Sequence, residues 1–492
     1  MSELFELAPQ RDFIDGTWQE LSMDRVDSGG STLWIEHAST GQPVVPQRAS
    51  TPERVEAALL AAQRLHDSGE WAHTSAAERA EVLDSIAADL QQRIPHVAGC
   101  ETAESGAALA TTSMLGFIVH AAFSLAAEQL RQGVLTQRFD GPHGDVEVSR
   151  LPFGPGLLLC PWNAPAPMAA HKVASALAAG APAILKPPER APHGCEAFGE
   201  AADALGLPAG LIQIVQGGPE VAAALMNDDR VSAVSFTGGI VGGRAVAHAC
   251  AQGLKPVQLE LGGLAPLVVL DDADPLNVAQ AAVGLLTTLN GQWCRALGRL
   301  MLPRQRAGEF LDAIVAALTD VVIGDPFLAT TQMGPMVHSE HLKVVHAAID
   351  HLRAQGGSLI APTPVPAESG NWLAPTLVTG VESSLACDEI FGPVATVHEY
   401  GSDAEAVALA NQTRYGLEAY VVGSDTDRAL DVARQIRAGG VKVNGVSPMS
   451  LNLMAPRPAF GLSGLGEEGT LETMWFFAGN QVVGIEGSLG AS

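Results

Sequence analysis

A cysteine, a glutamate and an asparagine in three separate segments could together carry out nucleophilic chemistry on a carbonyl group. Cys294 lies in the run Asn-Gly-Gln-Trp-Cys-Arg, between an apolar stretch and a predicted strand. The adjacent Arg295 and the backbone amides of such a loop would lower the pKa of the thiol, and the thiolate is the nucleophilic form. The alternative is that Cys294, like the other five cysteines, is a small buried apolar residue.

The glutamate and the asparagine would supply a base and a hydrogen-bond donor. Glu260 stands between two leucines and precedes a pair of glycines. A desolvated carboxyl group has a raised pKa and can act as a general base near neutral pH, although a capping or ion-paired glutamate gives the same pattern. Asn163 lies between two prolines, where its amide could stabilise an oxyanion by roughly 3 kcal/mol, or could simply occupy a turn.

A glycine-rich turn indicates where an anionic ligand could bind. Residues 236–243 read Phe-Thr-Gly-Gly-Ile-Val-Gly-Gly and follow a predicted strand. A pyrophosphate can approach the backbone closely at such a strand-to-helix turn. The spacing departs from the usual G-x-G-x-x-G pattern, so the turn alone is weak evidence for a dinucleotide.

The elements that must position these residues alternate between strands and helices. Short continuous apolar runs, typical of strands buried on both faces of a parallel sheet, occupy residues 156–160, 183–185, 211–215, 231–236 and 267–270. Apolar residues at helical spacing predict helices over 52–68 and 76–93, from Pro188 towards Leu205, and from Gly242. Later strands are predicted at 299–302, 395–400, 419–423 and 441–444, a hairpin within 131–150, and a last strand at 481–485. This alternation predicts a doubly wound α/β fold.

Composition excludes several classes of protein. Acidic residues outnumber basic ones by 54 to 28, and the formal net charge of −26 makes nucleic acid an unsuitable partner. The six cysteines form no CxxC pair, which favours reduced thiols and a cytoplasmic location. The acidic N-terminus shows no signal peptide, and low-polarity runs such as 278–289 are too short to span a membrane.

Taken together, the segments resemble the aldehyde dehydrogenase superfamily in content, order and spacing. The similarity extends from Phe13 to about Gly469, and Arg299 follows the cysteine at the expected distance. The family motifs PWN, KPxE, FTGS, LELGG, GQxC, EIFGPV and GxVxVN correspond here to residues 161–163, 186–189, 236–239, 259–263, 291–294, 389–394 and 440–444.

The resemblance implies a fold and an assembly. We expect a Rossmann-like NAD-binding domain from residues 1–127 and 151–259, an α/β catalytic domain from 260–469, and a small β oligomerisation element from 128–150 and 470–492. The same resemblance implies a homodimer or homotetramer that acts on a small-molecule aldehyde.

The resemblance also assigns roles to individual residues. Cys294 would be the nucleophile and Glu260 the general base for deacylation, while Asn163 and the backbone N–H of Cys294 would form the oxyanion hole. No metal ion is expected. The residues expected to contact the cofactor are Trp162, Lys186, Glu189, Gly239, Leu261, Glu389 and Phe391. Glu189 would repel a 2′-phosphate, which favours NAD and leaves NADP as the alternative.

Several positions depart from the family pattern. Gly239 replaces a serine, Leu264 a lysine and Leu289 an asparagine, and the motif at 460–464 is short and lacks its lysine. None of these changes affects the three catalytic candidates.

The residues expected around the aldehyde suggest its chemical class. Ala164 is smaller than the aromatic residue common at its position, and Trp293 favours an apolar or aromatic aldehyde. Arg295 would bind a carboxylate of a semialdehyde or, as the preferred interpretation, point away into a surface ion pair. An acyl-CoA-forming enzyme and a catalytically silent family member are the two competing functions.

Overall fold

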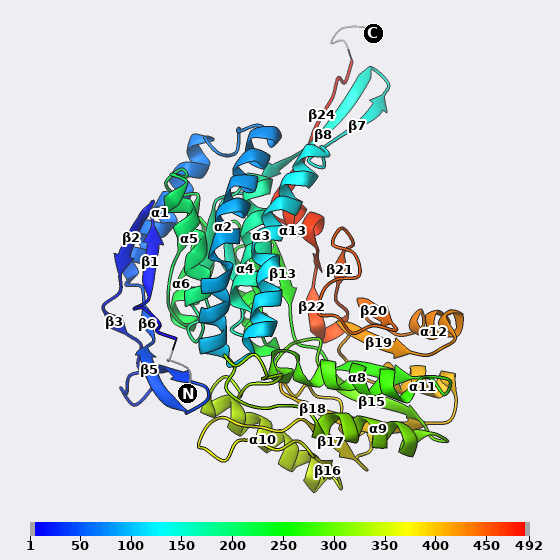
Figure 1. Cartoon of the computed structure of the whole chain (residues 1–492). Helices are drawn as coiled ribbons and strands as arrows, with labels where there is room; N and C mark the ends of the chain where they lie inside the picture. Colours follow the sequence, from blue (N-terminus) through cyan, green and yellow to red (C-terminus); the bar gives the residue numbers. More distant parts are fainter. Residues whose placement is uncertain (1–4, 488–492) are drawn as a thin grey trace.

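Two large sheets of mainly parallel strands and one small antiparallel sheet organise the computed structural model, which describes residues 5–487 (Figure 1). The first four and last five residues, which the predicted domain ranges include, lie outside the described residues. The first sheet has the order β2-β1-β11-β10-β9-β12-β13-β22. Its strands are β1 (Arg11–Ile14), β2 (Thr17–Glu20), β9 (Gly156–Leu159), β10 (Ala183–Lys186), β11 (Ile212–Ile214), β12 (Ala233–Thr237), β13 (Val257–Glu260) and β22 (Gly464–Leu465).

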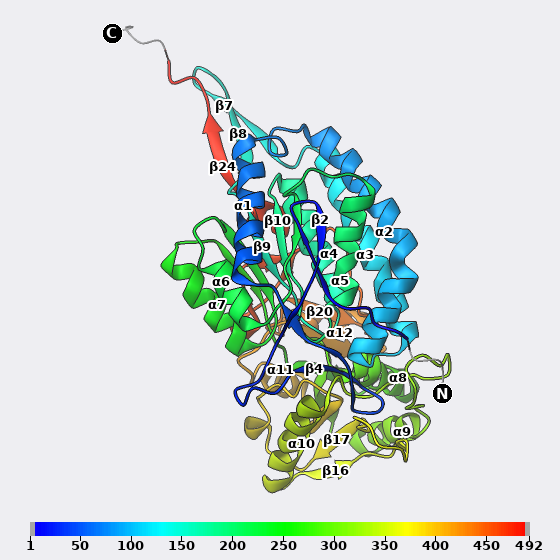
Figure 2. The ribbon, with the colours of Figure 1, turned by 90° about the vertical axis from the view of Figure 1, so that its left-hand side faces the viewer.

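Helices cover both faces of this sheet, as its apolar strands require. The residues of β9 and β10 are buried throughout, and five neighbouring strands pair in parallel, in the order β11, β10, β9, β12 and β13. Figure 2 shows one set of helices on each side. One side carries α1 (Pro52–Ser68), α6 (Pro219–Met226) and α7 (Ile240–Gln252), and the other α2 (Ala76–Ser105), α3 (Leu109–Arg131), α4 (Pro165–Ala179) and α5 (His193–Ala204).

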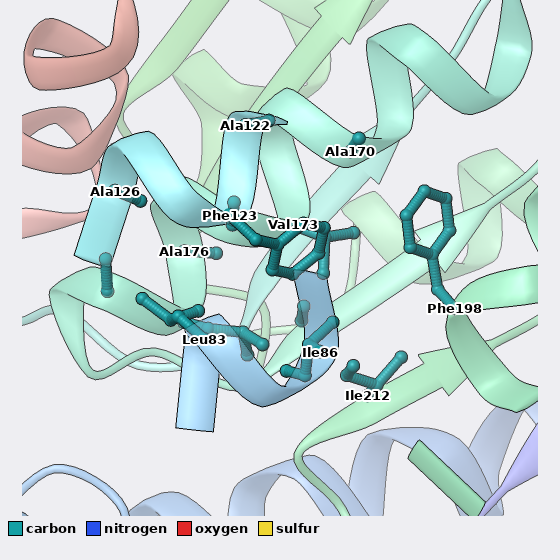
Figure 3. Close-up of a cluster of buried hydrophobic side chains, with 14 of the residues drawn as sticks. Leu83, Ile86, Ala122, Phe123, Ala126, Ala170, Val173, Ala176, Phe198 and Ile212 are labelled. Carbon is teal, nitrogen blue, oxygen red and sulfur yellow. The ribbon is translucent and has the colours of Figure 1, made fainter. Parts of the chain in front are cut away.

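Alanine-rich sequences allow the helices on the second side to pack closely. Ala170, Ala176 and Ala126 are buried among larger side chains such as Phe123 and Leu83 (Figure 3). Small residues at these positions let neighbouring helix backbones approach, and the larger side chains fill the remaining space. This core supports α4, whose first turn follows the predicted oxyanion donor Asn163.

Helix α3 lies in a segment for which the sequence analysis predicted no helix. Its 23 residues are apolar enough to cross a membrane by length and composition, although no run of that length was expected from the sequence. The apolar composition of α3 is explained by the two apolar environments that its residues occupy. Val119 and Phe123 are buried in the helical core, whereas Phe117 and Ile118 line a cavity beside Cys294.

The second large sheet has the order β16-β17-β18-β15-β14-β19-β20. Its strands are β14 (Ala265–Val269), β15 (Leu297–Pro303), β16 (Ser358–Ile360), β17 (Thr376–Thr379), β18 (Val394–Tyr400), β19 (Glu418–Val422) and β20 (Gly440–Val443). Its helices are α8 (Pro275–Thr287), α9 (Ala307–Thr319), α10 (Ser339–Ala354), α11 (Asp403–Ala410) and α12 (Thr426–Ala433). The chain passes from the first sheet to the second between β13 and β14, and this short connection contains the two glycines after Glu260.

The small sheet confirms the predicted hairpin and last strand. Strands β7 (Thr136–Gly141) and β8 (Gly144–Pro152) form the hairpin, and β24 (Ala478–Val483) pairs with β8 in antiparallel register. The three strands project from the rest of the molecule (Figure 1). Helix α13 (Thr470–Phe476) precedes β24 and packs on α4.

Two helix boundaries were predicted wrongly. Helix α2 does not end near Arg93 but continues through Pro95 to Ser105, because its packing against the neighbouring helices outweighs the hydrogen bond that the proline removes. The helix expected from Pro188 begins only at His193. Prolines at 187, 188 and 192 disfavour helical backbone in the residues before them, so this segment remains a loop.

Candidate active site

Two cavities meet at the predicted catalytic residues. The larger, with a volume of about 720 Å³, follows the carboxyl ends of the first sheet, and we call it the cofactor cavity. The smaller, of about 150 Å³, lies beside α3 and α4, and we call it the substrate cavity. Both are lined by Cys294, Glu260, Asn163 and Thr237. A reagent in either cavity can therefore reach the same sulfur atom.

An irregular turn presents Cys294 at this junction. The 3-10 turn Thr288–Gly291 follows α8 and includes two left-handed residues, Leu289 with φ of 49° and Asn290 with φ of 58°. Non-glycine residues rarely adopt this backbone conformation, and each instance costs of order 1–3 kcal/mol and persists only where the surrounding structure enforces it. The turn leads from α8 to Cys294, whose sulfur atom lies 3.5 Å from the carboxylate of Glu260 at the end of β13.

The side chain of Asn290 enforces this conformation. Its amide nitrogen donates to the carbonyls of Gly106, at 2.9 Å, and Pro335, at 2.8 Å. Its oxygen accepts a hydrogen bond from the backbone N–H of Gly334 at 2.8 Å. Asn290 therefore ties the turn to α2 and to the segment before α10, a role that the sequence analysis did not assign to it.

Paired glycines allow Glu260 to approach the nucleophile. A Cβ atom on Gly263 would lie 2.2 Å from the carbonyl oxygen of Cys294, and one on Gly262 would lie 2.1 Å from the carboxylate of Glu389. A side chain at Gly263 would therefore displace the backbone of Cys294, and one at Gly262 would displace the carboxylate of Glu389. The LELGG motif therefore has glycine at these two positions for a steric reason, because atoms of Glu389 and Cys294 occupy the space of a Cβ atom.

Cys294 and Glu260 form a hydrogen-bonded pair. The thiol donates to Oε1 of Glu260 at an Sγ–O distance of 3.5 Å. Burial and the nearby carboxylate raise the pKa of Cys294 well above its ordinary value, although Arg295 lowers it. The thiolate expected from the sequence is therefore not the resting form. Glu260 is placed to remove the thiol proton instead.

Burial sets the proton affinity of Glu260. Desolvation raises its pKa to about 7, and the negative charge of Glu468 adds to that effect, while Arg295 and Lys172 oppose it. A carboxyl group with this pKa can exchange protons near neutral pH, which is the property that a general base needs.

A buried ion pair behind Glu260 was missed by the sequence analysis. Nζ of Lys172 donates to Oε1 of Glu468 at 3.1 Å and to the hydroxyl of Ser235 at 2.7 Å. Burial raises the pKa of Glu468, but Lys172 and Arg457 more than offset this and leave it lowered. These residues come from α4, β12 and the segment before α13, and no short motif joins them.

Asn163 holds the turn that contains the nucleophile. Its amide nitrogen donates to the backbone carbonyl of Gln292 at 2.9 Å. A carboxamide nitrogen has two N–H donors, so one remains for an oxygen atom bound near Cys294. The structure therefore places the predicted oxyanion donor beside the predicted nucleophile.

One end of the cofactor cavity has groups suited to a ribose. Nζ of Lys186 at the end of β10 donates to Oε2 of Glu189 at 3.1 Å. Burial would raise the pKa of Glu189, but the charge of Lys186 and hydrogen bonds leave it lowered. The ionised carboxylate can accept hydrogen bonds from hydroxyl groups and would repel a phosphate.

The middle of the cavity fits an anionic linker. Gly239 precedes the first residue of α7, so the N-terminus of this 13-residue helix faces the cavity, and a Cβ atom on Gly239 would meet no atom within 4 Å. The buried hydroxyl oxygen of Thr237 has no hydrogen-bond partner among the described residues. Leu261 also lines this cavity and packs against Gly243 of α7. These features fit a dinucleotide.

The opposite end contains the remaining predicted contacts. Oε1 of Glu389 accepts a hydrogen bond from the backbone N–H of Gly263 at 2.9 Å, and burial raises the pKa of Glu389 to about 7. Trp162 and Phe391 pack edge to face with ring centroids 5.4 Å apart. His341 from α10 packs on Trp162 at the same distance and lines the cavity, a contact that no sequence motif indicated.

Arg295 forms an ion pair, but not at the surface. Its Nε lies 3.4 Å from Oε2 of Glu418, and only 14% and 5% of the two side chains are exposed. The expectation of a surface ion pair is therefore wrong, because Glu418 begins β19, a buried strand that is paired on both sides in the second sheet. Arg295 lines the substrate cavity next to Cys294.

Comparison with known proteins agrees with this geometry. The profile of the Aldehyde dehydrogenase family matches residues 26–483. A chloroplastic betaine aldehyde dehydrogenase from Beta vulgaris is 33% identical over 93% of this chain and 92% of its own length. A 3-succinoylsemialdehyde-pyridine dehydrogenase from Pseudomonas sp is 33% identical over 97% of this chain and 98% of its own.

Solved structures show the same architecture. A betaine aldehyde dehydrogenase from Staphylococcus aureus in complex with NAD+ superposes with a TM-score of 0.90 at 28% identity, covering 96% of this chain and 97% of its own. An aldehyde dehydrogenase from Pseudomonas syringae in complex with NAD+ and octanal gives a TM-score of 0.89 at 31% identity, covering 96% of each chain.

Proposed function

This chain belongs to the aldehyde dehydrogenase family and is an NAD-dependent enzyme, and from that premise we propose that it oxidises an aldehyde to a carboxylic acid through a thioester on Cys294. The observation that carries the proposal is the meeting of two cavities at one cysteine that is hydrogen-bonded to a buried glutamate. Neither residue would need this arrangement for packing alone.

The residues of the junction account for each step. Glu260 takes the proton of Cys294, and the sulfur attacks the carbonyl carbon of the aldehyde. The free N–H of Asn163 and the backbone N–H of Cys294 stabilise the resulting alkoxide. NAD, when bound, supplies the hydride acceptor. Glu260, after releasing the thiol proton to solvent, removes a proton from a water molecule that attacks the thioester, and the carbon–sulfur bond breaks to release the acid and the Cys294 thiolate.

The contacts in the cofactor cavity are assigned as follows. Lys186 and Glu189 hold the adenosine ribose, and the carboxylate of Glu189 disfavours a 2′-phosphate, so NAD is preferred over NADP. Glu389 holds the nicotinamide ribose and Phe391 packs beside the ring. Trp162, Gly239 and Leu261 lie along the dinucleotide.

We infer that the substrate has an apolar or aromatic body. The walls of the substrate cavity come mainly from apolar residues of α3 and α4, together with Leu289 and Trp293. Ala164 is buried and leaves the space that an aromatic side chain would fill. The relative from Pseudomonas syringae was solved with octanal, which is an apolar aldehyde.

Three further proposals concern the assembly, the domains and the location of the enzyme. Phe139, Leu151 and Val482 of the small sheet expose 55%, 47% and 65% of their surface, and burial of such residues in a dimer or tetramer would be favourable. The proposed domains are an NAD-binding domain of residues 1–127 and 151–259, a catalytic domain of residues 260–469, and an oligomerisation element of residues 128–150 and 470–492. A cytoplasmic location suits the six free cysteines, which in the structure form no disulfide.

Product analysis separates hydrolysis from acyl transfer to CoA. The purified enzyme is incubated with NAD and a panel of apolar, aromatic and carboxylated aldehydes, with and without CoA, and NADH and the acyl product are measured. We expect a free acid in equal yield under both conditions. An acyl-CoA product would contradict the role of Glu260, and no NADH with any aldehyde would favour a catalytically silent protein.

A further inference from the structure

A third cavity, which we call the side cavity, adjoins the substrate cavity. It has a volume of about 220 Å³ and lies between strands β19 and β20 and the segment 450–458. Arg295, Ser450 and Arg457 line both the side cavity and the substrate cavity, so the two share a wall. A substrate with its carbonyl at Cys294 can therefore extend towards the side cavity.

Positive charge is concentrated around the side cavity. Arg295, Lys442 and Arg457 line it, and Glu418 is the carboxylate among its lining residues. This excess of cations contrasts with the chain as a whole, which has 54 acidic and 28 basic residues. Glu418 and Glu468, which lies 3.5 Å from Arg457, offset two of these three charges, and a bound anion would offset the third.

The two arginines retain unused hydrogen-bond donors. Arg295 meets Glu418 through Nε at 3.4 Å, and neither of its Nη groups makes a hydrogen bond within the part of the chain that the structure describes. Arg457 meets Glu468 through Nη2 at 3.5 Å, which is a long contact for an ion pair. A guanidinium group has five N–H donors in a planar fork that matches a carboxylate.

Lys442 contributes charge without offering a donor. Its Nζ donates to the backbone carbonyls of Ser447 at 2.6 Å and Met449 at 2.9 Å. These bonds fix the segment that closes the side cavity and hold the ammonium group next to Glu418, 3.6 Å away. Arg295 and Arg457 are therefore the residues available to a ligand.

We propose that the side cavity binds a carboxylate at the far end of the aldehyde, so that the substrate is an ω-oxo acid whose apolar chain lies in the substrate cavity. This inference rests on the proposed function, because the aldehyde end must react at Cys294. Arg295 and Arg457 donate to the carboxylate oxygens, and the ion pairs with Glu418 and Glu468 keep the two guanidinium groups in place. The apolar walls contact the methylene or aromatic part between the two ends.

Matched aldehydes test the proposal. For the wild type and for Arg295→Met, Arg457→Met and Arg295→Lys, kcat/KM is measured with ω-oxo acids and with alkanals of the same chain length. The ratio of the two values cancels any general damage to Cys294. We expect each methionine variant to lower this ratio about tenfold to a hundredfold, as the loss of a charged hydrogen bond requires. Arg295→Lys keeps the charge and should lower the ratio less.

A binding readout that needs no turnover accompanies the kinetics. Dicarboxylic acids should raise the melting temperature of the wild type more than monocarboxylic acids of the same length, and the methionine variants should lose the difference. Arg353→Met removes an exposed arginine of α10, 59% of whose side chain is in solvent, and serves as the charge control. Ratios that stay equal in wild type and variants overturn the proposal, whereas failure to oxidise any aldehyde counts against the proposed function itself.

Discussion

The cofactor cavity and the substrate cavity are built in different ways, although they share Cys294. The cofactor cavity is bounded by strand ends of one sheet and by the helix that follows β12, so its walls come from short continuous segments. The substrate cavity is bounded by α3, α4, the turn before Cys294 and the segment 448–453, which are distant in sequence. The comparison shows that one reagent is recognised mainly through local backbone geometry and the other through long-range packing.

Removal of the shared sulfur should have the largest effect. Cys294→Ser is expected to lower kcat by about 10⁴-fold or more, since a serine hydroxyl is a far weaker nucleophile here. NAD affinity, measured by calorimetry, should change little because Cys294 lies at one end of the cofactor cavity. Cys100→Ala, at a buried site outside both cavities, is the control. Retained turnover in Cys294→Ser would remove the thioester mechanism.

Glu260→Gln should come next, with a steady-state rate about 10²- to 10⁴-fold lower. Stopped-flow absorbance is expected to show no burst of NADH, because the variant cannot take the proton of Cys294 and the thioester itself forms slowly. A full burst followed by slow turnover would limit the role of Glu260 to hydrolysis of the thioester, and an undiminished steady-state rate would exclude it as a base.

A change confined to the substrate cavity should affect one reagent only. Ala164→Phe fills buried space and is expected to lower kcat/KM for bulky aromatic aldehydes about tenfold to a hundredfold, from a packing penalty of about 1–3 kcal/mol. Acetaldehyde, which needs little of the cavity, serves as the internal control. The KM for NAD should stay constant, and a parallel rise in it would show that the two cavities are not independent.

The matching change in the cofactor cavity is Glu189→Gln. Loss of the carboxylate removes repulsion of a 2′-phosphate, so the ratio of kcat/KM for NADP to that for NAD should rise about tenfold. Glu56→Gln removes an exposed carboxylate of α1 and tests whether overall charge accounts for the effect. An unchanged ratio would mean that Glu189 does not face the ribose hydroxyls.

The smallest predicted effect concerns pH. The pKa of Glu260 is about 7, and because the base must be ionised, thioester hydrolysis should be slow below this pH and rise through it. Glu468→Gln removes a negative charge that raises this pKa, so the midpoint of the profile should move to lower pH. Glu467→Gln, at the exposed neighbouring position, should leave the midpoint unchanged. A shift to higher pH in Glu468→Gln would contradict the electrostatic account.

The contrast between the cavities also explains what the sequence could predict. Cys294, Glu260, Asn163 and the cofactor contacts lie in contiguous motifs, so the cofactor side and the parallel sheets were predictable from local patterns. Lys172 and Glu468 are separated by 296 positions, and only packing of α4 against the segment before α13 brings them together. No local sequence pattern predicts such an ion pair.

Prediction from sequence also failed where tertiary contacts overrode local preference. The extension of α2 through Pro95 depends on neighbouring helices that a local window does not include. The pKa of Cys294 was predicted in the wrong direction because the adjacent Arg295 is visible in the sequence, whereas burial and the approach of Glu260 are not. The same limitation led to Arg295 being placed at the surface.

The left-handed backbone of Leu289 has a consequence for how this enzyme can diverge. Glycine, which has no Cβ atom, avoids the cost of about 1–2 kcal/mol that this conformation has for leucine, and asparagine lowers the cost through local hydrogen bonds of its side chain. Leu289 forms part of the wall of the substrate cavity, so the strained turn supplies an apolar lining. Exchange of Leu289 for either residue would give a relaxed turn and a more polar or roomier cavity through a single amino-acid substitution, which makes this position a natural starting point for acquiring new substrates.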